Sequence, residues 1–161
     1  MDRSVTLTRQ HLILCAALGS ALLLAGAFVF QALGYAPCKM CIWQRYPHAA
    51  AIVLGALAFF VPLPFLIALG ALAALITAGI GGYHVGVEQG WWQGPTSCSA
   101  GAIENIDPDA LFDQIMAAPL IRCDEIAWQL FGLSMAGWNM VISLVLAGLW
   151  IAALAVRPTS A

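Results

Sequence analysis

The sequence predicts an all-α membrane protein, a bundle of four transmembrane helices with one long polar loop that carries short interfacial helices. Two observations support this fold class. Hydrophobic residues make up 62% of the chain and charged residues only 9%, whereas about a quarter of an average soluble domain is charged. The apolar residues also gather in four long runs, each close to the roughly 20 residues that cross a bilayer. No basic cluster indicates nucleic-acid binding.

The first span is predicted at residues 11–31, because no charged residue lies between Arg9 and Lys39. At about 1.5 Å per residue, this run crosses the ~30 Å hydrocarbon layer. A cleaved signal peptide is the alternative. However, the run is longer than a signal core of about 7 to 15 residues, and no clear cleavage site leads into a soluble domain. We expect the helix to be retained.

The second and third spans are predicted at residues 41–61 and 65–85. They are separated by a short turn that contains Pro62 and Pro64, and proline stops a helix because it lacks the N–H donor. No Asp, Glu, Lys or Arg occurs from Tyr46 to residue 87. The two spans should therefore form a helical hairpin.

A polar loop is predicted at residues 86–137, where seven of the eight acidic residues occur. Asp107 and Pro108 resemble the cap and first residue of a helix, and apolar residues follow on one face, which indicates a helix lying on the bilayer surface. This face consists of Leu111, Phe112, Ile115 and Met116. A second amphipathic piece leads into the fourth span at residues 138–156; its apolar residues are Trp128, Leu130, Phe131 and Leu133.

The four spans place both termini on one side of the membrane and both intervening loops on the other. The distribution of Lys and Arg decides the orientation only weakly. Four cysteines lie on the loop side, and disulfides persist outside the cytoplasm. We therefore expect residues 1–161 to form a single membrane domain with cytoplasmic termini and periplasmic loops.

The five cysteines divide into one thiol inside the first predicted span and two pairs. Cys15 lies inside the first span, where a free thiol behaves as a small hydrophobe. The other four allow three disulfide connectivities. Cys38 with Cys41 and Cys98 with Cys123 is the expected resting state, because the close pair meets most easily.

Redox chemistry is favoured over a metal site or a purely structural disulfide. A zinc site made from two cysteine pairs normally shows the short spacing twice, and here the second pair is 25 residues apart. We therefore expect no metal. Cys38 and Cys41 precede a membrane helix whose N-terminal N–H groups favour a thiolate. Arg45 follows Cys41 by one turn, so its guanidinium can lie beside that sulfur. The alternative is an arginine that extends to lipid phosphate.

The long-loop pair differs in its surroundings. Cys98 lies in the small-residue segment 94–101, whereas Cys123 lies between Arg122 and Asp124. Disulfide exchange needs an in-line attack on one sulfur, so Cys98 is predicted as the target of a partner thiol and Cys123 as the leaving group. Arg122 favours the Cys123 thiolate, whereas Asp124 and Glu125 oppose it, and the sequence leaves the balance between them open.

The order of these features resembles the DsbB family of bacterial inner-membrane proteins that form disulfide bonds. The features are a first helix, the motif Pro-Cys-Lys-Met-Cys-Ile-Trp-Gln-Arg at residues 37–45, a helical hairpin, a long loop with a second cysteine pair, and Gly-Leu-Ser-Met-Ala-Gly-Trp before the last helix. The resemblance covers essentially the whole chain. Two residues, Lys39 and Gln44, depart from the family pattern. At the position of Gln44, immediately before Arg45, the family often has an acidic residue.

The resemblance implies a thiol:quinone oxidoreductase. A DsbA-like periplasmic oxidase would attack Cys98, and electrons would pass through an interloop disulfide, Cys38 with Cys98, to the inner pair. Cys41 would then be the thiolate facing ubiquinone or menaquinone, with Arg45 stabilising the charge. His84 matches a family histidine near the quinone and is predicted to assist proton handling; an interfacial histidine bonded to backbone is the alternative.

Two other classes are weighed against this prediction. Enzymes similar to vitamin K epoxide reductase also join thiols to quinone through four helices, but their redox pair lies near the last helices, whereas here it follows the first. A tetraspanin-like interaction protein has a short loop and a long loop with cysteines, and that class leaves Cys38, Cys41 and Arg45 unexplained.

Overall fold

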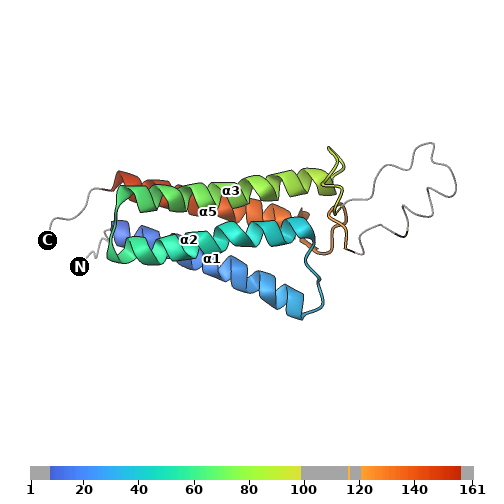
Figure 1. Cartoon of the computed structure of the whole chain (residues 1–161), viewed down its shortest axis with the longest axis horizontal. Coiled ribbons are helices and arrows are strands. Elements are labelled where there is room, and N and C mark those ends of the chain that lie inside the picture. The colour runs from blue at the N-terminus through green and yellow to red at the C-terminus, as the bar shows by residue number, and fades with distance from the viewer. Residues whose placement is uncertain (1–7, 99–115, 117–120, 157–161) are drawn as a thin grey trace.

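Four helices form an elongated bundle in the computed structural model, which describes residues 8–98, 116 and 121–156. The helices lie side by side along the long axis of the molecule (Figure 1), which confirms the predicted all-α fold class. In chain order they are α1 (Arg9–Ala32), α2 (Lys39–Phe60), α3 (Pro64–Glu88) and α5 (Met135–Ala155). The third helix continues beyond the predicted span and includes Glu88.

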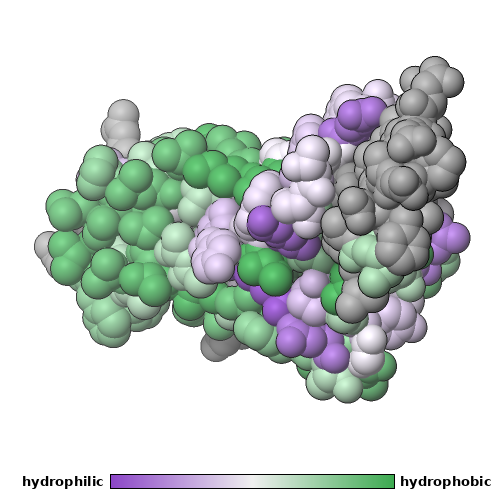
Figure 2. All heavy atoms as spheres, turned by 45° about the vertical axis from the view of Figure 1, so that its right-hand side comes forward, coloured by the Kyte–Doolittle hydropathy of each residue, from purple (hydrophilic) through white to green (hydrophobic). Residues whose placement is uncertain are grey.

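Among the described residues, α1, α3 and α5 are long and apolar enough to cross a membrane. Helix α2 has a similar length of 22 residues, but it carries several polar side chains. It packs against both α1 and α3, so its polar residues face other helices as well as the surroundings. Figure 2 shows apolar residues covering one end of the visible face and polar residues gathered toward the other.

Local sequence explains where the helices begin. The Thr8 side chain accepts a hydrogen bond from the His11 N–H, and the His11 ring contacts the Thr8 backbone in return, which satisfies free N–H groups at the start of α1. Pro64 is the first residue of α3, a position where a missing donor has no cost. The Ser134 hydroxyl accepts from the Gly137 N–H and caps α5.

The core of the bundle surrounds Trp150, which is fully buried between α1, α2, α3 and α5. Small residues allow the helices to approach it, as is typical of membrane helices. A Cβ atom added to Gly70 would lie 2.7 Å from the Trp150 ring, so only glycine fits there. This close contact holds α3 against α5.

Helix ends meet in two groups, one at each end of the bundle. At one end, the Arg9 guanidinium donates to the Val156 carbonyl at 2.6 Å and to the Ala153 carbonyl at 3.1 Å, which ties the start of α1 to the end of α5. At the other end, Cys38, Cys98 and Cys123 form one buried cluster. The bundle therefore brings both cysteine pairs together at the same end.

The structure differs from the prediction just before α5. The second amphipathic piece forms a short β-hairpin in which β1 (Gln129–Leu130) pairs with β2 (Leu133–Ser134). Its two turn residues, Phe131 and Gly132, both have positive φ angles of 53° and 78°, a conformation typical of two-residue hairpin turns. The predicted surface helix that begins at Asp107 lies outside the described residues, apart from Met116.

Candidate functional site: two cysteine pairs at one end of the bundle

The inner cysteine pair is formed by the cap and first turn of α2. Cys38 precedes the helix in an extended conformation, and its Sγ accepts a hydrogen bond from the Cys41 N–H at 3.2 Å. The two sulfurs are 2.9 Å apart, and neither forms a disulfide. The hydrogen bond from Cys41 and the nearby His84 lower the pKa of Cys38 to about 4, even though burial acts in the opposite direction.

The outer pair is a disulfide between Cys98 and Cys123, with a Cα–Cα distance of 5.3 Å. The Cys123 N–H also donates to the Cys98 carbonyl at 2.6 Å. Thus the outer pair is closed as expected, whereas the inner pair, which we expected to be closed, is open. Cys98 is only 1% exposed, so its sulfur is less accessible than its small-residue surroundings predict.

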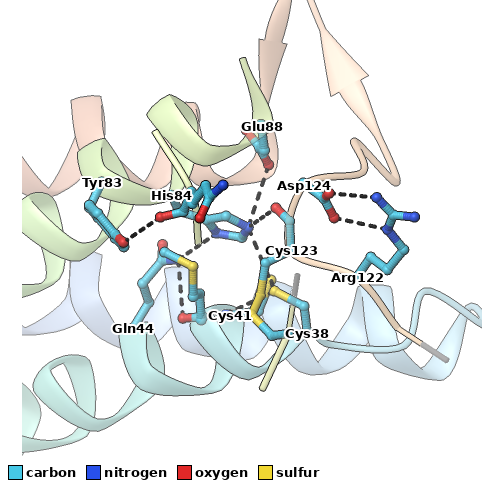
Figure 3. The surroundings of a disulfide bond; sticks show 12 residues. Cys38, Cys41, Gln44, Tyr83, His84, Glu88, Arg122, Cys123 and Asp124 are labelled. Atoms are coloured by element: carbon cyan, nitrogen blue, oxygen red, sulfur yellow. Dashed lines mark hydrogen bonds and ion pairs between the residues drawn. A yellow bond between two sulfur atoms is a disulfide. The ribbon is translucent and has the colours of Figure 1, made fainter. Parts of the chain in front are cut away.

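His84 lies beside both pairs (Figure 3). Its Nε2 is 3.6 Å from Cys38 Sγ and 3.1 Å from the Cys123 carbonyl oxygen. Its Nδ1 is 3.1 Å from the Gln44 side-chain nitrogen. Since Gln44 donates to Nδ1, the uncharged ring carries its hydrogen on Nε2, which can then donate toward the Cys38 sulfur. His84 therefore contacts both the inner and the outer pair.

The sulfurs of Cys38 and Cys123 also lie close together. These two atoms and a ring nitrogen of His84 are all within 4.8 Å of one another. Such a trio can hold a metal ion when all its sulfurs are thiolates, but here Cys123 is bonded to Cys98. In this oxidation state the short sulfur–sulfur distance favours disulfide exchange between the pairs.

Arg45 is held by α1. Its guanidinium donates to the Gln31 side-chain oxygen at 2.7 Å and to the Ala27 carbonyl at 3.3 Å, and it lies 4.8 Å above the Phe28 ring. Among the described residues, the Arg45 Nε atom is buried without a partner. These contacts anchor the guanidinium to α1, and Arg45 lines the same cavity as Cys41; its predicted effect on the Cys41 sulfur stays a prediction.

Arg122 does not act as a free positive charge beside Cys123. Its guanidinium forms two hydrogen bonds with the Asp124 carboxylate, at 2.6 and 3.0 Å, and also reaches Glu125 at 3.3 Å. The bond from Arg122 lowers the pKa of the Asp124 carboxyl group. The two opposing influences that the sequence placed around Cys123 therefore neutralise each other.

A cavity of about 430 Å³ opens beside the inner pair. Its wall is largely apolar and includes a few polar side chains, which is the usual composition of a ligand site. The polar and sulfur-bearing residues in the wall that matter here are Cys38, Cys41, Arg45, His48, His84 and Asn139. The structure thus brings Arg45, His84 and the inner cysteines to one cavity, and His84 also contacts Cys123 of the outer pair.

A row of buried and half-buried polar residues in this region was missed by the sequence reasoning. Asn139 donates to Gln44 Oε1 at 2.7 Å, and His48 contacts the Asn139 oxygen at 2.8 Å. Glu88 accepts from Ser134 and lies 3.8 Å from His84. The signal was available, because polar residues inside spans are rare and usually functional, and Gln44 and His48 are one helical turn apart.

Comparison with known proteins agrees with these features. The family model described as "Disulfide bond formation protein DsbB" matches residues 9–153. The chain is similar to disulfide bond formation protein B of Verminephrobacter eiseniae, with 35% identity over 84% of this chain and 79% of the relative. It is 33% identical to disulfide bond formation protein B 2 of Pseudomonas aeruginosa strain PAO1, over 78% and 79%, respectively.

A third relative, disulfide bond formation protein B of Haemophilus ducreyi, is 28% identical over 86% of this chain and 81% of its own length. No solved structure gives a significant match. Since the family model covers nearly the whole chain, including both cysteine pairs and the helices that carry them, the protein belongs to the DsbB family of multi-pass membrane, quinone-dependent disulfide oxidoreductases.

Proposed function

We propose that the protein reoxidises a DsbA-like thiol oxidase in the periplasm by passing electrons through its two cysteine pairs to a quinone of the inner membrane. The observation that carries this proposal is the junction at His84, where the sulfurs of Cys38 and Cys123 lie within 4.8 Å. Disulfides persist outside the cytoplasm, so the cysteine end of the bundle faces the periplasm and both termini face the cytoplasm.

The first exchange takes place at the outer pair. A donor thiolate attacks Cys98 and forms a mixed disulfide, and the bond to Cys123 breaks so that Cys123 leaves as a thiolate. Cys123 then attacks Cys38 of a closed inner pair, which forms a Cys38–Cys123 bond and releases Cys41 with the electron pair. The proximity of these sulfurs favours Cys123 as the partner of Cys38, in place of the Cys38–Cys98 bond implied by the resemblance.

The second exchange returns the outer pair to its closed form. The second donor thiolate breaks the mixed disulfide and releases Cys98, and Cys98 attacks Cys123 to displace Cys38. Two donor thiols have then become one disulfide, and two electrons remain on an open inner pair. A closed outer pair with an open inner pair is the combination that this order produces.

The cavity wall fits a quinone ring. It is largely apolar, it adjoins the inner pair, and it includes two buried polar atoms without partners among the described residues, Arg45 Nε and His48 Nδ1. Buried polar groups are nearly always hydrogen-bonded, so these atoms indicate a polar ligand. A bound quinone supplies an acceptor for two electrons and two protons. Arg45 would orient it, and His84 would stabilise the Cys38 thiolate beside it. We propose ubiquinone, with menaquinone as the alternative.

Purified full-length protein tests the proposal. With decylubiquinone as acceptor, it should oxidise a reduced DsbA-like protein, and Cys41→Ser should abolish the reaction because the inner pair can no longer close. Cys15→Ser is the matched control, since Cys15 lies on α1 away from both pairs and should leave the rate unchanged. Activity that survives Cys41→Ser would contradict the proposed electron exit. A naphthoquinone offered in parallel identifies the preferred quinone class.

A further inference from the structure

His48 is a titratable side chain in the cavity wall. It has no role in the electron route described above. It lies on α2, two turns beyond Cys41, and is only 3% exposed. Its Nε2 is 2.8 Å from Asn139 Oδ1. Its Nδ1 is buried and has no partner among the described residues. Because buried polar atoms are nearly always hydrogen-bonded, a buried nitrogen without a partner in a ligand cavity indicates that a bound ligand supplies the hydrogen bond.

The hydrogen-bond network around Asn139 determines which nitrogen of His48 carries the hydrogen. The Asn139 side-chain nitrogen donates to Gln44 Oε1 at 2.7 Å and lies 3.4 Å from the Thr77 carbonyl. The Gln44 side-chain nitrogen in turn donates to the Met40 carbonyl at 3.3 Å. Backbone carbonyls only accept hydrogen bonds, so they orient both amides. Asn139 Oδ1 is consequently the atom that faces His48.

An amide oxygen accepts, so His48 Nε2 must donate to it. In an uncharged imidazole the other nitrogen then holds a lone pair and acts only as an acceptor. The missing partner of Nδ1 is therefore a donor. A quinone ring presents carbonyl oxygens, which only accept, whereas the reduced ring presents O–H groups, which donate. Nδ1 thus distinguishes the two oxidation states of the ligand.

We propose that His48 Nδ1 accepts a hydrogen bond from an O–H of the reduced quinone, with Asn139 as the positioning residue that keeps Nδ1 an acceptor. This inference rests on the proposed function and adds that the cavity binds the reduced quinone more tightly than the oxidised quinone. Tighter binding of the reduced form favours reduction of the bound ring, since a ligand shifts an equilibrium by its differential affinity. A tenfold preference corresponds to about 30 mV for a two-electron couple.

Direct binding measurements test this inference without relying on turnover. Decylubiquinone and decylubiquinol are titrated anaerobically into full-length Cys41→Ser protein, which cannot close the inner pair and so leaves the ligand in its starting form. Tryptophan fluorescence reports binding, because Trp128 and Trp138 line the cavity. His48→Leu should weaken decylubiquinol binding roughly tenfold, the value of one buried hydrogen bond, and change decylubiquinone binding by less than about twofold.

His11→Leu is the matched control, because His11 caps α1 at the far end of the bundle and should change neither affinity. Asn139→Leu should reduce the preference for decylubiquinol, since Nδ1 can then carry the hydrogen and donate to the oxidised ring. A structural role alone would weaken both ligands equally. Equal losses for the two ligands in His48→Leu, or no loss, would overturn the inference.

A second measurement avoids substitution at the site. In Cys41→Ser protein with ¹⁵N-labelled histidine, decylubiquinol should shift the Nδ1 resonance of His48 and decylubiquinone should not; a resonance that stays fixed with decylubiquinol would overturn the inference. The proposed function is tested separately with the unsubstituted protein. If that protein fails to pass electrons from a reduced donor to decylubiquinone, the function itself fails, whereas normal transfer with an unselective His48 removes only this inference.

Discussion

Individual hydrogen bonds divide the chemical roles of the two inner cysteines. Cys38 Sγ accepts a hydrogen bond from the Cys41 N–H and lies 2.9 Å from the Cys41 sulfur and 3.6 Å from His84 Nε2. The side-chain bond with Cys41 is the largest cause that lowers the pKa of Cys38. A hydrogen bond that lowers the pKa of Cys38 is one that the Cys41 thiol donates to the Cys38 thiolate. In the reduced protein Cys38 is therefore the thiolate. Cys41 acquires the charge only when Cys38 forms a bond with another sulfur, as in the proposed Cys38–Cys123 intermediate.

The low pKa of Cys38 predicts how the reduced protein responds to pH. Because this pKa falls from 9.0 to about 4, Cys38 should stay a thiolate across the neutral range and lose its reactivity only as the pH approaches 4. Iodoacetamide labelling of reduced protein, with Cys38 quantified by mass spectrometry, measures this profile. Labelling that decreases already between pH 9 and pH 8 would contradict the assignment of the thiolate to Cys38.

The same shift affects stability. Between about pH 4 and pH 9 the unfolded chain binds more protons at Cys38 than the folded one, so the contribution of this group to the free energy of unfolding is complete above pH 9 and disappears as the pH falls through 4.

Cys41→Ala removes the largest cause of the lowered Cys38 pKa and should move the pH midpoint of Cys38 labelling upward. His84→Leu removes a smaller contribution and should move it less.

Arg45 gives a second prediction at this scale. Arg45→Ala should weaken decylubiquinone binding by tenfold or more, because a charge-assisted hydrogen bond contributes about 1.5 to 3 kcal/mol, and it should leave the Cys98–Cys123 disulfide intact. Arg45→Lys should recover only part of the affinity, since lysine lacks the planar fork. Arg9→Ala at the opposite end should not change it. Titration against quinone measures the effect, and unchanged affinity in Arg45→Ala would refute the role.

At the scale of whole helices, the contact between small residues and the Trp150 ring determines how the helices pack. Trp150 of α5 is fully buried and faces Gly70 of α3. Membrane helices gain little from the hydrophobic effect between them, so close packing supplies much of their association. The position of α3 along α5 therefore depends on this contact. That position in turn places His84 and Glu88 near the hairpin and the cysteines.

Two glycines of α3 form a matched test of this contact. A methyl group at Gly70 would lie 2.7 Å from the Trp150 ring, whereas one at Gly79 would meet nothing within 4 Å. Gly70→Ala should destabilise the protein by about 1 to 3 kcal/mol, the usual effect of overpacking. Gly79→Ala should be neutral or slightly stabilising, because alanine favours the helix. Thermal unfolding in detergent compares them; equal stability of the two variants would contradict the packing described.

Sequence predicted helices more readily than the hairpin, for a physical reason. Hydropathy reveals a span because the bilayer requires about 20 apolar residues. The hairpin contains only two residues in each strand, too few for alternation to be recognised. Its turn also places Phe131 at a positive φ, which bulky residues rarely adopt. Gly132 was the one local indication of a turn.

For the molecule as a whole, the number of spans predicted that both cysteine pairs lie at the same end of the bundle. It did not predict how the two pairs are oriented toward each other. An even number of spans returns the chain to the same side, so both loops had to meet at one end. Which sulfur of the outer pair faces Cys38, and which residue faces His48, depends on the rotation of each helix about its axis. Asn139 contacts His48 across 91 residues of sequence, and hydropathy contains no information on that rotation.

This arrangement leads to a prediction that distinguishes two electron routes. Cys38 and Cys123 belong to opposite halves of the chain, yet their sulfurs lie within 4.8 Å. A protein with Cys41→Ser and Cys98→Ser retains these two sulfurs and should close a Cys38–Cys123 disulfide rapidly on mild oxidation. A protein with Cys41→Ser and Cys123→Ser retains Cys38 and Cys98 and should close more slowly, because the group of atoms within 4.8 Å of one another consists of Cys38, His84 and Cys123.

Peptide mapping under non-reducing conditions identifies the bond in each protein and gives its rate of formation. Cys15→Ser is included in both, so that no third thiol competes. Faster closure of Cys38 with Cys98 would restore the interloop bond that family resemblance implied and would remove Cys123 as the attacking group. Faster closure of Cys38 with Cys123 would mean that the packing of α2, α3 and the segment before the hairpin itself selects the electron route, since attack requires the two sulfurs to approach in line.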